Sequence, residues 1–414
     1  MNDTLVYVDI RGVTTFAGTP YSHRRRNVET SSFMYAADYI GNPHADALDP
    51  ELPLGAGSFP TRNGASLFGA FGDCAPDRWG RTLVKRRESA LAREEGRAAK
   101  TLGEVDYLLG VRDDLRQGAL RFRVGQTGPF LATDESGVPA LTDLPQLMEL
   151  ADRAESDTAD LADLQRLIRV GSSLGGARPK AHVRDRNGRI SIAKFPSAAH
   201  DTWNVMAWEK VALDLAEDAG VVVPTSRLLS LVGRHVLVVE RFDRTSDGGR
   251  VGYVSAMTML EASDGDQRSY TEIGDVIERF SSTATAELHQ LWRRVAFSVL
   301  ISNTDDHLLN HGFLHAGGDA WRLAPAFDLN PNPDTGARHL ATAINNSDDE
   351  ADLGLLLSVT RSFRLSEPQG RSMLLDVAAV VGQWRDVAAR LGLAPKEVES
   401  MSPAFRRVRE AAEM

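Results

Sequence analysis

The stretch NTDDHLLNHGFL, residues 303–314, follows a long apolar segment and is the part of the sequence that decides the fold. It places Asp305, Asp306 and His307 in a row and adds Asn310 after two leucines. Polar clusters of this kind are costly to bury and are usually solvated loops. The residues that follow decide whether this cluster is a plain loop or a functional site.

A β-hairpin is predicted directly after the polar cluster. GFLHA (312–316) is typical of a strand, GGD (317–319) of a tight turn, and the apolar residues after it of a return strand. A hairpin folded about this turn brings its two open ends together, and those ends carry Asn310 and Asp328. Amide and carboxylate oxygens are ligands that Mg²⁺ accepts, with phosphate and water completing its shell. The pattern therefore predicts a magnesium site at these two residues.

The spacing of Asp305 and Asn310 matches the D-x-x-x-x-N of a kinase catalytic loop. In that loop the Asp receives the proton of the substrate hydroxyl and the Asn holds Mg²⁺, while a later Asp binds the metal as well. Asp328 stands where that later acid is expected. A helix C-terminus followed by a polar loop is the alternative for the spacing alone. Asp306 either orients the loop or raises the pKa of Asp305 by like-charge repulsion.

An earlier strand offers a lysine for the phosphates of a nucleotide. Ile190, Ile192 and Lys194 share one face of this predicted strand, because alternate side chains point the same way. Apolar side chains under an adenine and an ammonium group at its phosphates would use that face. Glu209, on a later predicted helix, either pairs with Lys194 as in kinases or is an ordinary surface acid.

Two further segments carry weaker signals. VGSSLGGARPKAHV (170–183) is rich in glycine, which lets backbone N–H groups approach phosphate oxygens. It is not a Walker A loop, because Ala177 follows Gly176 where that motif has a lysine. VVERFDR (238–244) is an apolar strand that ends in charged residues, and it is a candidate link between two lobes.

Taken together, these segments resemble the HipA-like serine/threonine kinases, which are toxins of bacterial toxin–antitoxin pairs. The segments that carry the resemblance in the family's order are SSLGGARPK (172–180), AKFP (193–196), VERFDR (239–244), NTDDHLLN (303–310) and PAFDL (325–329). FGDCAPDRWGRTLVKR (71–86) and RQGALRF (116–122) resemble the N-terminal subdomain of the same family.

The resemblance implies roles for residues at the matching positions. Asp305 would be the catalytic base, and Asn310 and Asp328 would bind Mg²⁺. The residues that would contact ATP are Gly175, Gly176, Ala177, Arg178, Lys180, Lys194, Glu240, Arg241, Phe242, His307, Asn310 and Asp328, with Glu240 to Phe242 using backbone groups. Ser173, or its neighbour Ser172, would be autophosphorylated, and the added negative charge would expel the glycine-rich loop and silence the kinase.

The resemblance also implies partners and a fold. The substrate would be a translation protein, for example an aminoacyl-tRNA synthetase, and the usual partner is a HipB-like helix-turn-helix antitoxin that binds DNA. The expected fold is α+β and two-lobed like a protein kinase, with a mixed N-terminal lobe and a mainly helical C-terminal lobe. The expected parts are a β-rich N-terminal subdomain (1–143), the nucleotide-binding part of the N-lobe (144–245) and the C-lobe (246–414).

Local patterns predict individual elements independently of the resemblance. They are a strand at 4–10, a helix at 75–97, a strand at 116–124, a helical stretch over about 144–168 and a helix over about 203–219.

Composition limits the alternatives. The 414 residues indicate two or three domains, and the net charge of −10 argues against broad binding to nucleic acid, so DNA contact is expected only through the antitoxin. Cys74 is the single cysteine, so no internal disulfide can form. There is no signal-peptide pattern and no apolar run of membrane-spanning length, so a cytoplasmic protein without membrane contact is expected.

Three other functions stay open at this point. A small-molecule kinase on a related scaffold would use the same residues, and a non-catalytic corepressor would keep only the contact with the antitoxin. A metal hydrolase built on Asp305, Asp306, His307 and His311 lacks the glutamate of the zinc protease motif and leaves Lys194 without a role.

Overall fold

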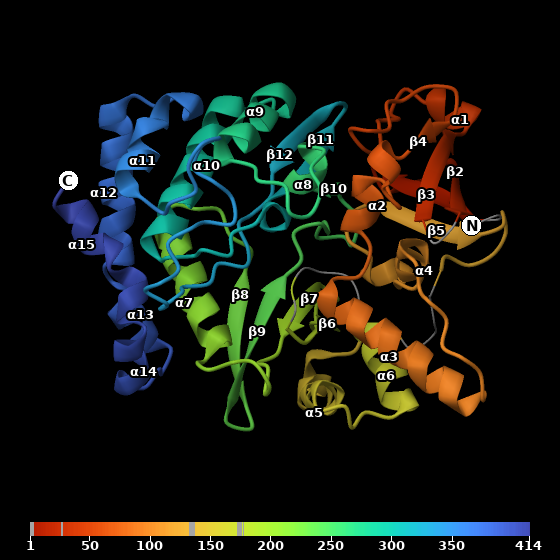
Figure 1. Cartoon of the computed structure of the whole chain (residues 1–414), viewed down its shortest axis with the longest axis horizontal. Helices are drawn as coiled ribbons and strands as arrows, with labels where there is room; N and C mark the ends of the chain where they lie inside the picture. The colour runs from red at the N-terminus through yellow and green to blue at the C-terminus, as the bar shows by residue number, and fades with distance from the viewer. Residues whose placement is uncertain (1–3, 26–27, 132–136, 172–175, 177) are drawn as a thin grey trace. The chain divides into compact units, whose positions relative to one another are not determined.

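The computed structural model describes residues 4–25, 28–131, 137–171, 176 and 178–414. The chain forms two compact units, which are described separately below (Figure 1). The first unit comprises Met1–His200 and Glu240–Val254, and the second comprises Asp201–Val239 and Ser255–Met414. The predicted domain limits after residues 143 and 245 stay predictions.

The first unit is built on an antiparallel sheet. Its described elements are β1 (Thr4–Ile10), β2 (Val13–Arg25), β3 (Val28–Tyr35), α1 (Ala37–Ile40), β4 (Phe59–Pro60), η1 (Arg62–Gly64), α2 (Gly69–Asp73), α3 (Arg78–Glu94), α4 (Glu104–Leu109), η2 (Asp113–Leu115), β5 (Leu120–Val124), η3 (Leu141–Asp143), α5 (Leu144–Glu155), α6 (Leu161–Val170), β6 (Lys180–Arg184) and β7 (Ile190–Lys194). The strand order is β4-β3-β2-β1-β5, so β1 pairs with a strand on each side.

Aromatic side chains form the core under this sheet. Phe33 and Phe122 are fully buried, and Phe71 packs edge-on against both rings at centroid distances of 5.8 and 5.6 Å. Edge-to-face pairs of this kind add to the stabilisation from burial. α3 lies alongside α6 (Figure 1), and its first turn is capped by Asp77, whose carboxylate accepts the N–H of Gly80. The predicted strand at 4–10 and helix at 75–97 are therefore confirmed, the helix with its start at Arg78.

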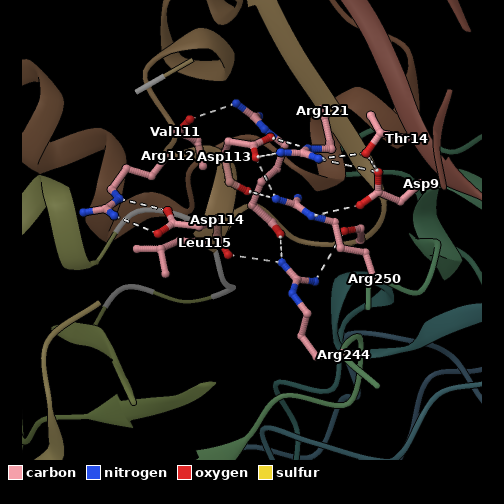
Figure 2. A network of polar contacts seen from close by, with 12 residues as sticks. Asp9, Thr14, Val111, Arg112, Asp113, Asp114, Leu115, Arg121, Arg244 and Arg250 are labelled. Carbon is pink, nitrogen blue, oxygen red and sulfur yellow. Dashed lines mark hydrogen bonds and ion pairs between the residues drawn. The ribbon is translucent and has the colours of Figure 1, made fainter. Parts of the chain in front are cut away.

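A network of buried charges ties η2 to the sheet (Figure 2). Asp113 is 2% exposed and accepts from the guanidinium groups of Arg121, at 2.6 Å, and Arg250, at 2.8 Å. Asp9 on β1 pairs with the same two arginines at 3.7 and 3.4 Å. Arg121 also donates to Thr14 on β2. One acid thus holds together segments that lie more than a hundred residues apart in the chain.

Removing this acid should destabilise the first unit. In Asp113→Ala, Arg250 and Arg121 lose their main counter-charge inside the protein, and we expect a loss of about 3 kcal/mol in the free energy of unfolding. Urea unfolding measures the change. Glu95→Ala is the control, because Glu95 pairs with Arg97 at the exposed surface and such a pair contributes less than about 1 kcal/mol. Equal losses in both variants would contradict the role of the network.

The second unit is mainly helical. Its elements, with the flanking strand β10, are α7 (Val205–Asp218), β8 (Ser226–Leu231), β9 (Arg234–Glu240), β10 (Tyr253–Ser255), α8 (Ala256–Met259), α9 (Tyr270–Phe280), α10 (Ala284–Leu300), η4 (Leu308–Asn310), β11 (Gly312–Gly317), β12 (Ala320–Leu323), α11 (Leu353–Ser358), η5 (Thr360–Phe363), α12 (Glu367–Val381), α13 (Trp384–Arg390), α14 (Pro395–Ser400), η6 (Ser402–Phe405) and α15 (Arg407–Ala412). α10 contacts α9 on one side and α12 on another (Figure 1).

α10 is the central helix of this unit. Leu288, Leu291, Trp292 and Val295 are at most 1% exposed, and burial of aliphatic and aromatic side chains is the main stabilising contribution to such a core. A second aromatic group joins α7, α13 and η6, where the ring of Trp384 stacks on Phe405 at 4.3 Å. The buried apolar face of α10 holds this helix in the core up to the point where the polar loop begins.

Across the described part of the chain, no helix combines the length and the apolar character that a bilayer crossing requires.

Candidate active site

The predicted hairpin is present. β11 and β12 pair antiparallel with Phe313 opposite Leu323 and His315 opposite Trp321. Gly317 and Gly318 make the turn, with φ angles of +100° and +58° that residues with a side chain rarely adopt. The ladder continues to the open end, where the N–H of Ala324 donates to the carbonyl of Gly312. The chain therefore leaves both strands at the same end, with Asn310 before one and Asp328 after the other.

The loop between α10 and β11 holds Asn310 in a defined orientation. The Nδ2 of Asn310 donates to the carbonyl oxygen of Asp305 at 3.0 Å, and the N–H of His307 donates to the same oxygen at 3.0 Å. Because the amide nitrogen of Asn310 donates to the Asp305 carbonyl, the amide oxygen of Asn310 is directed away from that carbonyl. This oxygen is the atom that can bind a hard cation. Asn310 is 6% exposed, whereas Asp305 is exposed.

Asp306 points the other way and is buried, with 3% of its surface exposed. Its Oδ2 accepts the hydroxyl groups of Tyr270, at 2.8 Å, and Ser298, at 3.1 Å. Its Oδ1 lies 3.1 Å from the Nε2 of His311, within ion-pair distance. We call these four residues, Asp306, Tyr270, Ser298 and His311, the Asp306 cluster.

The carboxylate of Asp306 is stabilised in its ionised form. Burial opposes ionisation, but His311 and the hydroxyl donors outweigh it and hold the pKa of Asp306 below its ordinary value. Burial and the adjacent charge raise the pKa of Tyr270 well above its ordinary value, so its hydroxyl stays a donor. Of the two roles predicted for Asp306, these contacts support the one that orients the loop.

The segment after β12 returns to the same loop. Asp328 has a φ of +60°, a left-handed conformation that Asp tolerates better than most residues. Asn330 donates to the carbonyl of Asp328 at 3.2 Å, and Asn332 donates to the hydroxyl of Thr304 at 3.0 Å. Thr304 directly precedes Asp305, so these contacts bring the Asp328 segment to the loop that carries Asp305 and support the predicted metal pair.

Two observations bear on ligands at this loop. The Nδ1 of His307 is buried and has no hydrogen-bond partner within the described part of the chain. An orphaned buried nitrogen of this kind is unusual in a folded protein and is compatible with a ligand beside it. Among the residues that the structure describes, no group of three or more His, Cys, Asp or Glu side chains is arranged to hold a metal ion. Asp306 and His311, which the metal hydrolase alternative needs as ligands, instead contact each other.

The predicted nucleotide residues of the first unit have varied surroundings. Lys194 ends β7, is half-buried, and is in register with Lys180 on β6. Lys180 is 4% exposed, and its Nζ forms an ion pair with Asp77 at 2.7 Å. Burial raises the pKa of Asp77 despite this partner. Lys180 and Asp77 thus form a buried ion pair that connects β6 to the start of α3.

Glu209 lies on α7 in the second unit and is 2% exposed. The interpretation of Glu209 as an ordinary surface acid is therefore wrong. Its pairing with Lys194 stays a prediction, because the two residues belong to different units. Ser172, Ser173, Gly175 and Ala177 lie outside the described residues.

The segment VERFDR supplies a second buried charge network. Asp243 is 3% exposed and accepts from Arg241 at 2.6 Å, from Arg244 at 2.8 Å and from the N–H of Gly118 at 2.7 Å. Both guanidinium groups also donate to the carbonyl of Arg116. The side chains of this segment therefore anchor RQG (116–118). The N–H of Arg241 donates to the carbonyl of Ile190 at 3.3 Å, and the predicted adenine contacts of Glu240 to Phe242 stay predictions.

Asp243→Asn should destabilise the protein by about 3–5 kcal/mol near neutral pH, because two buried guanidinium groups lose their counter-charge. Burial opposes ionisation of Asp243, but Arg241 and Arg244 outweigh it and hold its pKa well below the ordinary value of 3.8. A lowered folded-state pKa contributes stability above the unfolded value and loses it as the pH falls toward the folded value. Urea unfolding at pH 7 and at about pH 3 should therefore show a smaller difference between wild type and variant at the lower pH.

Asp247→Asn is the control for this prediction, because Asp247 lies three residues after this segment and is exposed. It should leave the unfolding midpoint close to that of wild type, because surface substitutions of this kind have small effects on stability. A pH-independent difference for Asp243→Asn would contradict the assigned role of its charge.

Sequence reasoning missed the donors of the Asp306 cluster. Tyr270 lies 36 residues before Asp306 and Ser298 lies 8 residues before it, on two different helices. The capping box of α9, in which Ser269 and Glu272 bond reciprocally, marks the start of a helix but does not indicate what Tyr270 contacts. In the sequence, the signal available for these contacts was the adjacency of Asp305 and Asp306, since two neighbouring acids can differ in burial.

The structure is that of an α+β chain whose mainly helical part carries an Asp–Asn loop, a hairpin and a second Asp, in the order in which the sequence predicted them. The family model of the HipA-like C-terminal domain matches residues 172–412, more than half of the chain. The chain therefore belongs to the family of proteins with a HipA-like C-terminal domain. The predicted resemblance is confirmed.

Solved structures and relatives agree with this family. The chain superimposes on a chain of the Shewanella oneidensis MR-1 toxin–antitoxin complex of HipA, HipB and operator DNA with a TM-score of 0.69. The match covers 99% of this chain and 96% of that one at 16% sequence identity. This shows a shared fold, and the predicted kinase-like α+β fold with a mainly helical C-terminal part is confirmed.

Two relatives are similar in sequence. “Putative kinase Y4dM” from Sinorhizobium fredii is 30% identical over 152 residues, and “Putative kinase” from Haemophilus influenzae is 24% identical over 135 residues. These matches cover 33% and 29% of this chain. The chain spans 36% and 39% of the length of these curated relatives.

Proposed function

We propose that this chain is a serine/threonine protein kinase that transfers the γ-phosphate of ATP to a protein and acts as the toxin of a toxin–antitoxin pair. The observation that carries the proposal is the loop of Asp305 and Asn310. The amide nitrogen of Asn310 donates to the Asp305 carbonyl, so the amide oxygen is directed elsewhere, and the side chain of Asp305 is exposed at the same loop. Phosphoryl transfer depends on such positioning and on charge neutralisation more than on covalent chemistry.

Each residue of the loop has a distinct task in this proposal. Asp305 accepts the proton of the attacking Ser or Thr hydroxyl, which requires a carboxylate that reaches solvent and an incoming protein chain. His307, with its buried unpartnered Nδ1, lies beside the nucleotide. Asp306 is held inside the protein and takes no part in proton transfer.

The oxygen donors of Asn310 and Asp328 suit Mg²⁺, a hard cation that is commonly held by one or two protein oxygens together with substrate phosphates. When bound there, Mg²⁺ would neutralise the charge of the phosphates during transfer. The left-handed backbone of Asp328 and the bonds of Asn330 and Asn332 keep this acid beside the loop.

The first unit supplies the remaining nucleotide contacts under the proposal. Lys194 holds the phosphates, and backbone groups of Glu240 to Phe242 contact the adenine. Gly175 to Lys180 cover the phosphates, and Ser173 or Ser172 is the site of self-phosphorylation. The ammonium of Lys180 is paired with Asp77, so its charge is partly compensated before a phosphate binds.

The partners follow from the solved relative. Its structure contains HipB and operator DNA, and we infer that this chain binds a HipB-like helix-turn-helix antitoxin and meets DNA through it. The net charge of −10 fits this indirect contact, since extensive phosphate binding requires a basic surface. The proposed substrate is a translation protein such as an aminoacyl-tRNA synthetase.

The central test is self-labelling. Wild-type protein incubated with Mg²⁺ and radiolabelled ATP should incorporate phosphate, and Asp305→Asn and Asp328→Asn should each reduce incorporation at least about a hundredfold, because base and metal ligand are lost. Asn is the suitable replacement at 328, since it tolerates the left-handed backbone. Labelling that survives both changes would remove the kinase assignment. Transfer to metabolites but not to proteins of a lysate would indicate a small-molecule kinase, and absent ATP binding in calorimetry would indicate a corepressor.

A mass measurement tests self-phosphorylation separately. Intact wild-type protein should carry an added mass of about 80 Da per phosphate, consistent with one modified serine. Peptide mapping should place it at Ser173 or Ser172. The added mass should be absent from Asp305→Asn and from the Ser172→Ala/Ser173→Ala double variant. A phosphate that persists in the double variant would place the modification elsewhere.

A further inference from the structure

The Asp306 cluster is more elaborate than a polar loop requires. Its central carboxylate is 3% exposed, receives hydroxyl donors from the first residue of α9 and from α10, and lies within ion-pair distance of the residue that precedes β11. Burying a carboxylate is costly unless it is fully paired, and replacing it with an apolar group would often stabilise a protein more. A buried charge at this place therefore points to a requirement other than stability.

The peptide unit that joins Asp305 to Asp306 is fixed from several sides. Its carbonyl oxygen, that of Asp305, accepts from Asn310 and His307. The next carbonyl, that of Asp306, accepts the hydroxyl of Thr342 at 2.7 Å. Since a peptide unit is planar, these bonds together with the held Asp306 side chain leave the Asp305 α-carbon little freedom. The α-carbon from which the exposed Asp305 side chain extends is thus held in place next to the buried Asp306.

We propose that the Asp306 cluster positions the Asp305 carboxylate for phosphoryl transfer, an inference that rests on the proposed function. The hydroxyl groups on α9 and α10 act through Asp306 and touch neither nucleotide nor substrate. Arg294 on α10 interacts electrostatically with Asp306. Burial lowers the pKa of Arg294 to about 10, and the negative charge of Asp306 opposes part of this lowering. Arg294, 4% exposed, supplies a further positive charge near the carboxylate.

Ser298 and Ser302 offer a matched pair of variants. Both are buried serines, Ser298 in the last turn of α10 and Ser302 two residues after the helix ends, and both hydroxyl groups make hydrogen bonds. Ser298 donates to Asp306, whereas Ser302 donates to the carbonyl of Ala404 and accepts from Arg407. Ser298→Ala and Ser302→Ala therefore remove the same group with similar burial, and only the first touches the cluster.

The expected result is a loss of turnover without a loss of nucleotide affinity. Ser298→Ala should lower the rate of phosphoryl transfer at saturating Mg·ATP by about tenfold, because a hydrogen bond to a charged group is lost and the base is misplaced. Its KM for ATP should stay within about twofold of wild type. Ser302→Ala should keep the wild-type rate per folded molecule even if its melting temperature falls as much. Tyr270→Phe, which keeps the ring beside His311, should behave like Ser298→Ala.

Hydrogen exchange supplies a readout that does not need activity. The backbone N–H groups of His307 and Asn310 are hydrogen-bonded within the loop, so both should exchange faster in Tyr270→Phe than in wild type. Equal transfer rates in Ser298→Ala and Ser302→Ala, or unchanged exchange in Tyr270→Phe, would overturn the inference. A wild-type protein that neither binds ATP nor labels itself would overturn the proposed function instead, and the exchange measurement would still decide whether the cluster holds the loop.

Discussion

The pairing of buried carboxylates is the constraint on which both units depend. Asp113, Asp243 and Asp306 are each at most 3% exposed, and each collects donors from segments far apart in the chain. An unpaired charge at such a place would be strongly unfavourable, so the partner segments must come together in one arrangement. Asp113 and Asp243 do this for the irregular segments at 113–118 and 241–250 of the first unit. Asp306 does it for the loop of the second unit that carries the candidate base.

This constraint explains how an exposed site can be rigid. The candidate chemical groups, Asp305 and Asp328, are exposed or half-buried, and neither lies in a regular element. Loops of this kind carry function when a rigid scaffold positions them. The scaffold here is α10, whose C-terminal half from Arg294 to Leu300 is buried without a break, together with the hairpin and the hydroxyl donors. The left-handed conformation of Asp328 lies where the chain turns after the hairpin.

The elements that the sequence predicted have local signals. The hairpin was predictable because Gly317 and Gly318 allow positive φ angles, and α7 because its apolar residues recur every three to four positions before Gly220. The predicted helical stretch at 144–168 consists of two helices, α5 and α6. Asp157 breaks it with a φ of +58°, and Asp160 caps the second helix. A cap and a helix interior use similar polar residues, so this break was hard to predict.

The candidate site was predictable as a set of residue types and spacings, but not as a set of contacts. Lys180 shows the difference. The resemblance to the HipA-like family implies a nucleotide contact for Lys180, yet its ammonium pairs with Asp77, a residue 103 positions earlier in the motif APDRWG. Nothing local to either residue indicates this pair, because an ion pair depends on how two distant segments fold. The same holds for Tyr270 and Asp306, where a hydroxyl on one helix decides how an acid on a later loop is held. Long-range pairing of polar side chains is therefore the part of this site for which a structure was needed, and it is also the part that we propose to position the candidate base.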